Sequence, residues 1–154
     1  MSRVILALFA LCLFCLSFVE AASLQRYDRR QIGNLQCNID RLKIVADLAG
    51  AKSTAQTLTQ QLASDAAGSQ SISTVSDGIS SAQSAIGQIA AALLTGQQAP
   101  AAARDQVAAG LTQATQALAN ITSTDATVTQ NLSKIQGQLS KAADAGNGVV
   151  TNCK

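Results

Sequence analysis

The chain has 154 residues, with eleven Lys and Arg against nine Asp and Glu, and it contains no His and no Trp. This length holds at most one domain. From residue 31 onward seven basic residues balance seven Asp, and no aromatic residue occurs. The body therefore lacks both the basic face that holds a phosphate backbone and the aromatic platforms that stack bases, which argues against a nucleic-acid partner.

The N-terminal segment has the features of a secretory signal. Arg3 precedes an apolar run from Val4 to Val19, and Ala21 supplies a small residue at the expected cleavage point. Residues 1–21 are therefore predicted to be a removed signal peptide, with an uncleaved membrane anchor as the alternative. The mature protein is expected to be secreted and extracellular, with no transmembrane segment.

A short basic leader follows at residues 22–30. Arg29 and Arg30 form a dibasic pair after Arg26, which is typical of a processing site for a furin-type protease. A solvated basic tail explains the same residues equally well. In either case the helical domain is expected to span residues 31–154.

Two of the four cysteines, Cys12 and Cys15, lie in the predicted signal. The remaining two, Cys37 and Cys153, stand at opposite ends of the body. In an oxidising secretory route such a pair usually forms a disulfide, and closing so long a loop stabilises the fold by about 4–5 kcal/mol. The alternative is pairing between two chains.

The first predicted helix begins near Asn34, a residue type that caps helices well. Its expected buried stripe is Leu35, Ile39, Leu42, Val45 or Ala46, and Ala49, widened by Ile44 and Leu48. This helix is expected to be the most buried one. Lys43 is placed at helical spacing from Asp40 and from Asp47, which predicts surface ion pairs.

The stripe shifts near Gly50, where the pattern continues at Ala51, Ala55, Leu58, Leu62 and Ala66. We expect a helix break at Gly50, rather than a continuous helix with a stripe that rotates from Ile44 and Leu48. Gly68 to Ser71 predicts a stop followed by capping serines.

The next predicted helix carries the apolar stripe Ile72, Val75, Ile79, Ala82, Ile86, Ile89 and Leu93. Gly96 is a natural residue to follow its C-terminus. Pro100 fits the first turn of the helix after it, because a missing N–H costs nothing there.

The region from Val107 to Ala142 has the most regular pattern. Its apolar residues recur at steps of four and three, which places them on one face of an α-helix. Asp125 falls on that face, and a buried carboxylate without a partner would be costly. We therefore expect a break or kink at 122–125 with Asp125 as a helix cap. Gly146-Asn147-Gly148 is expected to end the last helix, with Val149 to Cys153 extended.

The predicted disulfide restricts the arrangement of these helices. Three long helices would leave Cys37 and Cys153 about 50 Å apart at ~1.5 Å per residue, whereas a disulfide needs Cα atoms about 6 Å apart. The fold class is therefore predicted to be all-α, an antiparallel bundle of four or five amphipathic helices with its ends joined by one disulfide.

No constellation for catalysis, metal binding or cofactor binding is found. The body contains no His and no Glu, and its Asp residues are scattered over polar faces. General acid–base chemistry and metal coordination both need clustered groups. We expect a protein that is not an enzyme; for Asp125 a cap is favoured over a functional buried carboxylate.

Asn120 and Asn131 begin two N-glycosylation sequons, Asn120-Ile121-Thr122 and Asn131-Leu132-Ser133. Such sequons also arise by chance in chains rich in Ser and Thr, so occupancy is left open.

The composition itself gives the best indication of function. The predicted core consists of Ala, Leu, Ile and Val, and the surface is rich in Ser, Thr and Gln rather than in charge. Amphipathic helices of low charge can lay their apolar stripes on lipid or another hydrophobic surface. The simpler interpretation is that these stripes only form a core. A secreted interaction, signalling or defence-related protein, which would have a protein receptor, is the alternative function.

A signal peptide, a basic leader and a Cys-poor helical body rich in Ala, Ser, Thr, Gln, Leu and Ile resemble the hydrophobic-surface-binding protein A and cell-wall mannoprotein group of secreted fungal proteins. The resemblance covers residues 31–145 and concerns their overall composition. It implies an α-helical fold and binding to hydrophobic surfaces or fatty acids.

Overall fold

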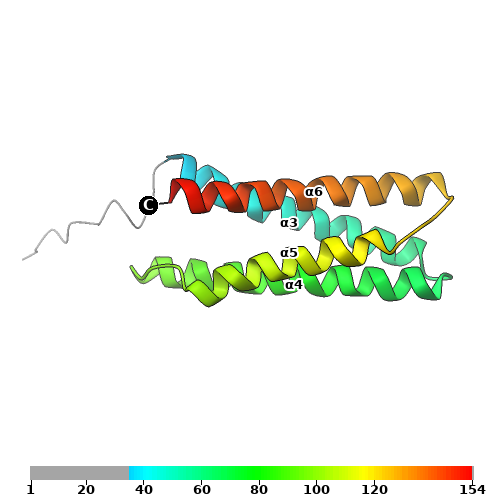
Figure 1. Cartoon of the computed structure of the whole chain (residues 1–154), viewed down its shortest axis with the longest axis horizontal. Helices are drawn as coiled ribbons and strands as arrows, with labels where there is room; N and C mark the ends of the chain where they lie inside the picture. The colour runs from blue at the N-terminus through cyan, green and yellow to red at the C-terminus, as the bar shows by residue number, and fades with distance from the viewer. Residues whose placement is uncertain (1–34, 154) are drawn as a thin grey trace, which may run out of the picture.

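The computed structural model describes residues 35–153, which form four α-helices (Figure 1). These are α3 (Leu35–Gln61), α4 (Ala66–Leu94), α5 (Ala101–Ala119) and α6 (Ala126–Asn152). Successive helices run antiparallel (Figure 1). The prediction of an all-α antiparallel bundle is confirmed for this part of the chain, with four helices. The predicted signal, leader and Asn34 cap lie outside the described residues.

The two ends of the bundle differ. The turns at 62–65 and 120–125 lie at one end, which we call the loop end (Figure 1). The turn at 95–100, the start of α3 and the end of α6 lie at the other, which we call the disulfide end because Cys37 and Cys153 are bonded there.

The helices pack as two pairs. α3 packs extensively on α6 and α4 on α5, whereas the pairs make far fewer contacts with each other. In the α4–α5 pair, Gly78 and Gly110 face each other and allow the two backbones to approach closely. In the α3–α6 pair, polar side chains connect the helices: Thr54 Oγ1 donates to Gln138 Oε1 at 3.0 Å, and Asn131 Nδ2 donates to Gln61 Oε1 at 3.1 Å.

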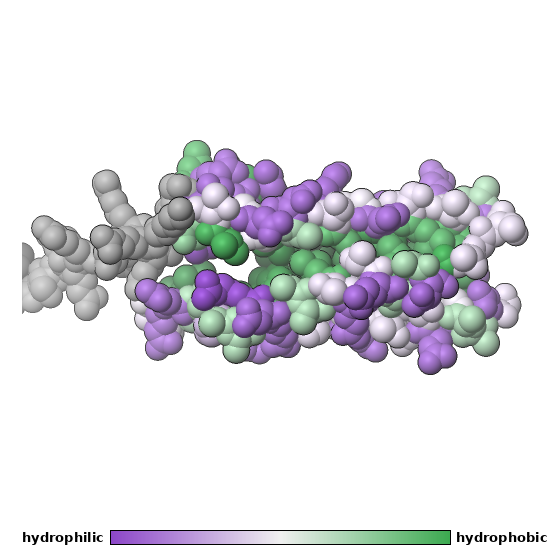
Figure 2. Space-filling model, viewed as in Figure 1, coloured by the Kyte–Doolittle hydropathy of each residue, from purple (hydrophilic) through white to green (hydrophobic). Residues whose placement is uncertain are grey.

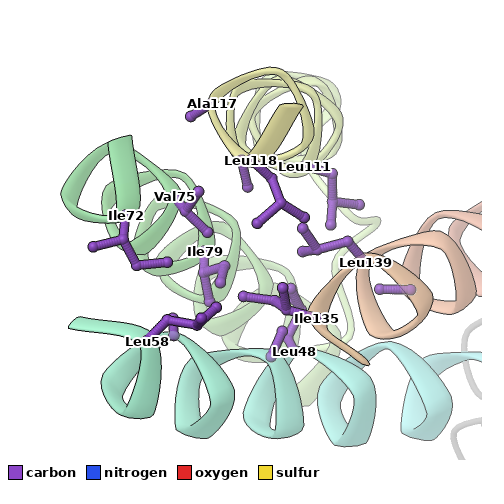
Figure 3. Close-up of a cluster of buried hydrophobic side chains, with 14 of the residues drawn as sticks. Leu48, Leu58, Ile72, Val75, Ile79, Leu111, Ala117, Leu118, Ile135 and Leu139 are labelled. Carbon is purple, nitrogen blue, oxygen red and sulfur yellow. The ribbon is translucent and has the colours of Figure 1, made fainter. Parts of the chain in front are cut away.

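All four helices contribute to one aliphatic core (Figure 3). Its largest fully buried side chains, Cys37 apart, are Leu48, Leu58, Ile72, Val75, Ile79, Ile135 and Leu139. Alanines fill much of the remaining space, including Ala51, Ala82, Ala114 and Ala142. Full burial of a Leu or Ile side chain stabilises a fold by about 1.5–3 kcal/mol, so these aliphatic residues hold the bundle together.

The turns follow the local chemistry of their residues. Gly96 has a φ of 76° and follows Thr95, the C-cap residue of α4. Its N–H donates to the Leu93 carbonyl, and the Gln97 N–H donates to the Ala92 carbonyl. This pair of hydrogen bonds is a Schellman motif, so the predicted helix end at Gly96 is confirmed. Pro100 is the N-cap residue of α5, which begins at Ala101, so it directly precedes the first turn in which it was predicted.

Asp125 caps α6 as predicted. Its carboxylate accepts hydrogen bonds from the backbone N–H groups of Thr127 and Val128, at 2.8 and 3.0 Å. The Thr127 hydroxyl donates to the same oxygen. The break at 122–125 is confirmed, and Asp125 is exposed rather than a buried functional carboxylate.

The predicted break at Gly50 is wrong, because α3 is continuous from Leu35 to Gln61. Its buried face runs through Ile44, Leu48, Ala51, Ala55 and Leu58, which is the rotated stripe that was set aside. The helix continues because Leu48 and Ala51, on either side of Gly50, are both buried in the core. The Gln138 side chain of α6 lies against Gly50, where a Cβ would be 2.6 Å from Gln138 Nε2.

The buried stripe predicted for the start of the first helix is also wrong, although α3 has as many buried residues as α4. Leu35, Leu42 and Val45, which belong to the stripe predicted for this segment, are exposed. The inward positions of the same turns hold Cys37 and Asp40 instead. A periodic aliphatic pattern therefore lies outside the core here.

Two further predicted helix ends are wrong. Gly68 lies inside α4, which starts at Ala66. The N-cap of this helix is Asp65, whose carboxylate accepts a hydrogen bond from the Ala67 N–H at 3.1 Å. Similarly, α6 continues through Gly146 and Gly148 to Asn152, so Val149 and Val150 are helical rather than extended. Contacts of this last turn with α3 outweigh the weak helix propensity of Gly and Val.

Candidate functional site

The disulfide end brings together the residues with unusual environments. Cys37 in the first turn of α3 and Cys153 after the last turn of α6 form a disulfide with a Cα–Cα distance of 5.1 Å. The predicted intramolecular pairing is therefore confirmed. Cys37 is fully buried.

One turn further along α3, Asp40 is buried with only 5% of its surface exposed. Its carboxylate accepts hydrogen bonds from Asn152 Nδ2 of α6 and from Gln36 Nε2, both at 2.9 Å. Lys43 Nζ lies 3.7 Å from it. Hydrogen bonding by Asn152 lowers the pKa of Asp40 below its ordinary value against the opposing effect of burial, and Gln36 and Lys43 lower this pKa further.

The sequence placed Asp40 on the surface, and that prediction is wrong. The signal that could have identified it is its register, since Asp40 lies three residues after Cys37 and four before Ile44 on one helical face. Gly148 of α6 makes room for the carboxylate, because a Cβ at Gly148 would lie 2.6 Å from Asp40 Oδ2. Asp40, Asn152 and the disulfide thus fix α3 to α6.

The large hydrophobic side chains that are exposed gather at the disulfide end. Among residues 35–153 they are Leu94 (88% exposed), Leu35 (76%), Leu42 (70%), Val150 (69%) and Val45 (50%). They lie in the first three turns of α3, the last turn of α4 and the last turn of α6, all toward this end of the bundle (Figure 1). We call these five residues the apolar end. Single exposed apolar residues are ordinary, but their collection at one end of a bundle is not.

On the inward stripe of α4, burial of the large aliphatic side chains decreases toward the apolar end, whereas Ala85 and Ala92 stay buried. Ile72, Val75 and Ile79 are fully buried, whereas Ile86 and Leu93 are only half-buried. On α5, Val107 is half-buried, whereas the smaller Ala103, one turn closer to the disulfide end, is only 2% exposed.

Figure 2 shows that the two helix pairs separate toward the disulfide end and leave an opening between them, next to hydrophobic residues. The bundle is therefore closed at the loop end and partly open at the disulfide end.

A separate groove runs along the surface of the α3–α6 pair, with a volume of about 390 Å³. Its lining is almost entirely charged and of both signs: Asp40, Lys43, Asp47, Lys141, Asp144 and Ala145. Within residues 35–153 no group of three or more His, Cys, Asp or Glu side chains is placed to hold a metal ion. None of the helices there is long and apolar enough to cross a membrane.

The other residues singled out in the sequence lie elsewhere. Asn120 follows the last turn of α5 and Asn131 lies in the second turn of α6, so both sequons are near the loop end. Asn120 is exposed and Asn131 is half-buried. The possible processing site at Arg29 and Arg30 lies outside the described residues.

The fold and this site define a small disulfide-linked helical bundle with an apolar end. No protein-family model matches the chain, and no curated protein or solved structure matches it either.

Proposed function

We propose that this protein is a secreted, non-enzymatic helical bundle that binds lipid or another hydrophobic surface through its apolar end. The observation that carries the proposal is the collection of Leu35, Leu42, Val45, Leu94 and Val150 at the one end where the helix pairs separate. Clustered exposed apolar side chains are typical of sites that bind lipids, membranes or other proteins.

The low charge of the surrounding surface supports an apolar partner. Charged residues make up only 13% of the chain, and the body is electrically near neutral. Binding would then depend on the removal of apolar area from water, which is worth roughly 25 cal/mol per Å². Long-range electrostatic attraction would contribute little.

The small residues between the helices support a mechanism in which the opening widens. Within the α4–α5 pair, Gly78 and Gly110 allow the backbones to approach closely. Within the α3–α6 pair, the disulfide and Asp40 connect the helices. The two pairs contact each other mainly through aliphatic side chains. Separation of the pairs at the disulfide end would expose half-buried Ile86, Leu93 and Val107 to an apolar ligand.

The test uses the oxidised protein with two probes: a fatty acid that carries an environment-sensitive fluorophore, and adsorption to polystyrene beads. Leu42→Gln, Val45→Gln and Leu94→Gln are combined in one variant, because substitutions at exposed positions change stability little. Ala63→Gln, Ala67→Gln and Ala126→Gln, at exposed positions of the loop end, form a control with the same number of substitutions.

We expect wild type and the control to bind at least one probe, and the apolar-end variant to bind it at least several-fold more weakly. Equal binding by both variants would move the site away from this end. A wild-type protein that neither binds the fatty acid nor adsorbs to the beads would refute the function.

A further inference from the structure

The exposed residue Asn120 lies at the far end of the molecule from the apolar end. It is the cap residue that follows α5, and its backbone N–H donates to the Ala117 and Leu118 carbonyls. Within the described part of the chain, no hydrogen bond involves its side-chain amide, so that Nδ2 faces solvent without a protein acceptor. Asn120 begins the loop 120–125, and N-glycosylation sequons are used in surface loops of secreted proteins.

The neighbours of Asn120 tolerate a modification there. Ile121, the middle residue of the sequon, is buried and closes the core at the loop end, whereas Thr122 is exposed. The side chains of the sequon are thus divided: the apolar one anchors the loop, and the two that a glycosylating enzyme recognises face solvent.

The second sequon lies in a different environment. Asn131 is half-buried within α6, and its Nδ2 donates to Gln61 Oε1 of α3 at 3.1 Å. Its middle residue, Leu132, packs against the core. A glycan on Asn131 would replace one of the two amide hydrogens beside this surface contact of α6 with α3, and it would crowd the Gln61 side chain.

We propose that Asn120 carries an N-linked glycan in the secreted protein and that Asn131 does not. In the transfer, Nδ2 of Asn120 attacks C1 of the first sugar of a lipid-pyrophosphate-linked oligosaccharide. The bond from C1 to the pyrophosphate oxygen breaks as the Nδ2–C1 bond forms, the lipid pyrophosphate leaves with the electron pair, and Nδ2 loses one proton. The proposal depends on the predicted secretion and is independent of lipid binding.

The position of this glycan has a consequence for the whole molecule. A hydrophilic group on the loop end leaves the apolar end uncovered, because the two ends are separated by the length of the helices (Figure 1). The glycan would therefore hydrate one end and leave the other available for contact.

The experiment expresses the full chain in eukaryotic cells that secrete it, and compares wild type with Asn120→Gln, Thr122→Ala and Asn131→Gln. The products are treated with peptide-N-glycosidase, which converts a glycosylated Asn to Asp, and their peptides are mapped by mass spectrometry. Thr122→Ala keeps Asn120 but removes the hydroxyl that the sequon requires. It therefore separates loss of glycan from loss of the Asn120 side chain.

We expect wild type and Asn131→Gln to shift in mass on treatment, with Asp found at position 120. Asn120→Gln and Thr122→Ala should not shift. A wild-type chain without a glycan on Asn120, whether secreted or retained, overturns the proposal, and so does a glycan found on Asn131.

Discussion

Gly78 of α4 and Gly110 of α5 lie face to face at the closest approach of the α4–α5 pair. A Cβ atom on Gly78 would come within 2.6 Å of the Gly110 carbonyl oxygen, and a Cβ on Gly110 would come equally close to the Gly78 carbonyl oxygen. Real Cβ atoms do not approach a backbone oxygen so closely, so both positions require glycine.

We therefore expect Gly110→Ala to destabilise the fold by about 1–3 kcal/mol, which is the usual cost of adding a methyl group to a packed interior. Gly87→Ala is the control, because Gly87 lies in α4 with nothing within 4 Å of a Cβ. It should stabilise the protein by about 0.5–1 kcal/mol through helix propensity alone. Urea unfolding measures both, and equal effects of the two substitutions would show that the helices do not touch at Gly110.

A second pair of glycines tests the Asp40 site. Gly148→Ala would push a methyl group into the Asp40 carboxylate, whereas Gly146, two residues earlier in α6, has open space around it. We expect Gly148→Ala to lower the melting temperature by several degrees and Gly146→Ala to raise it slightly. A melting temperature unchanged by Gly148→Ala would mean that Asp40 is not held against α6.

Removal of the disulfide should cost more than any single side chain named above. The bond joins residues that are 116 apart in sequence, so its loss in a Cys37→Ala/Cys153→Ala double variant is expected to reduce stability by about 4–5 kcal/mol. The core from Leu48 to Leu139 does not include the two cysteines, so the helical circular dichroism of the folded variant should persist at low temperature. Loss of less than about 1 kcal/mol would show that other contacts already hold the ends.

Acid should weaken the cap of α6. The hydrogen bond from the Thr127 hydroxyl, followed by those from the Val128 and Thr127 backbone N–H groups, lowers the pKa of Asp125 below its ordinary value of 3.8. A carboxylate with a lowered folded-state pKa contributes stability above the unfolded-state value and loses it as the pH falls through the folded-state value. The contribution is therefore full at pH 7, and it declines below about pH 4.

Asp125→Ser is the variant for this measurement, because Ser also caps helices, does not titrate and, unlike Asn, creates no glycosylation sequon with Ala126 and Thr127. Wild type should be the more stable of the two at neutral pH, and the difference should narrow as the pH is lowered toward 3. A difference in urea midpoint that stays constant across this range would exclude the charge of Asp125 as its cause.

Periodicity predicted the helices of this chain well where strong capping residues accompanied it. Asp125 and Gly96 could be identified as helix boundaries because their roles depend only on residues near them in sequence. Asp125 caps the backbone N–H groups that follow it, and Gly96 adopts the positive φ that ends a helix. Gly50, Gly68 and Gly148 were misread as boundaries. Each lies inside a helix, with another side chain in the space that a Cβ would take: Gln138 at Gly50, Asp65 at Gly68 and Asp40 at Gly148. A single sequence does not contain that information.

The apolar end was missed for a related reason. Leu35, Leu42 and Val45 repeat at helical spacing, and periodicity alone does not distinguish a stripe that enters the core from one that faces solvent. The two partners of the disulfide were predictable because only two cysteines occur in the body of the chain. The buried Asp40 was not, because its partner Asn152 lies 112 residues away.

The covalent link between Cys37 and Cys153 also determines how the molecule responds to mechanical tension. Force applied to the chain outside these two residues is carried by the disulfide, which holds their Cα atoms 5.1 Å apart. The helices between the two residues therefore bear none of the load. The bundle would therefore act as an inextensible node in a tether, and it would lengthen under load only after reduction.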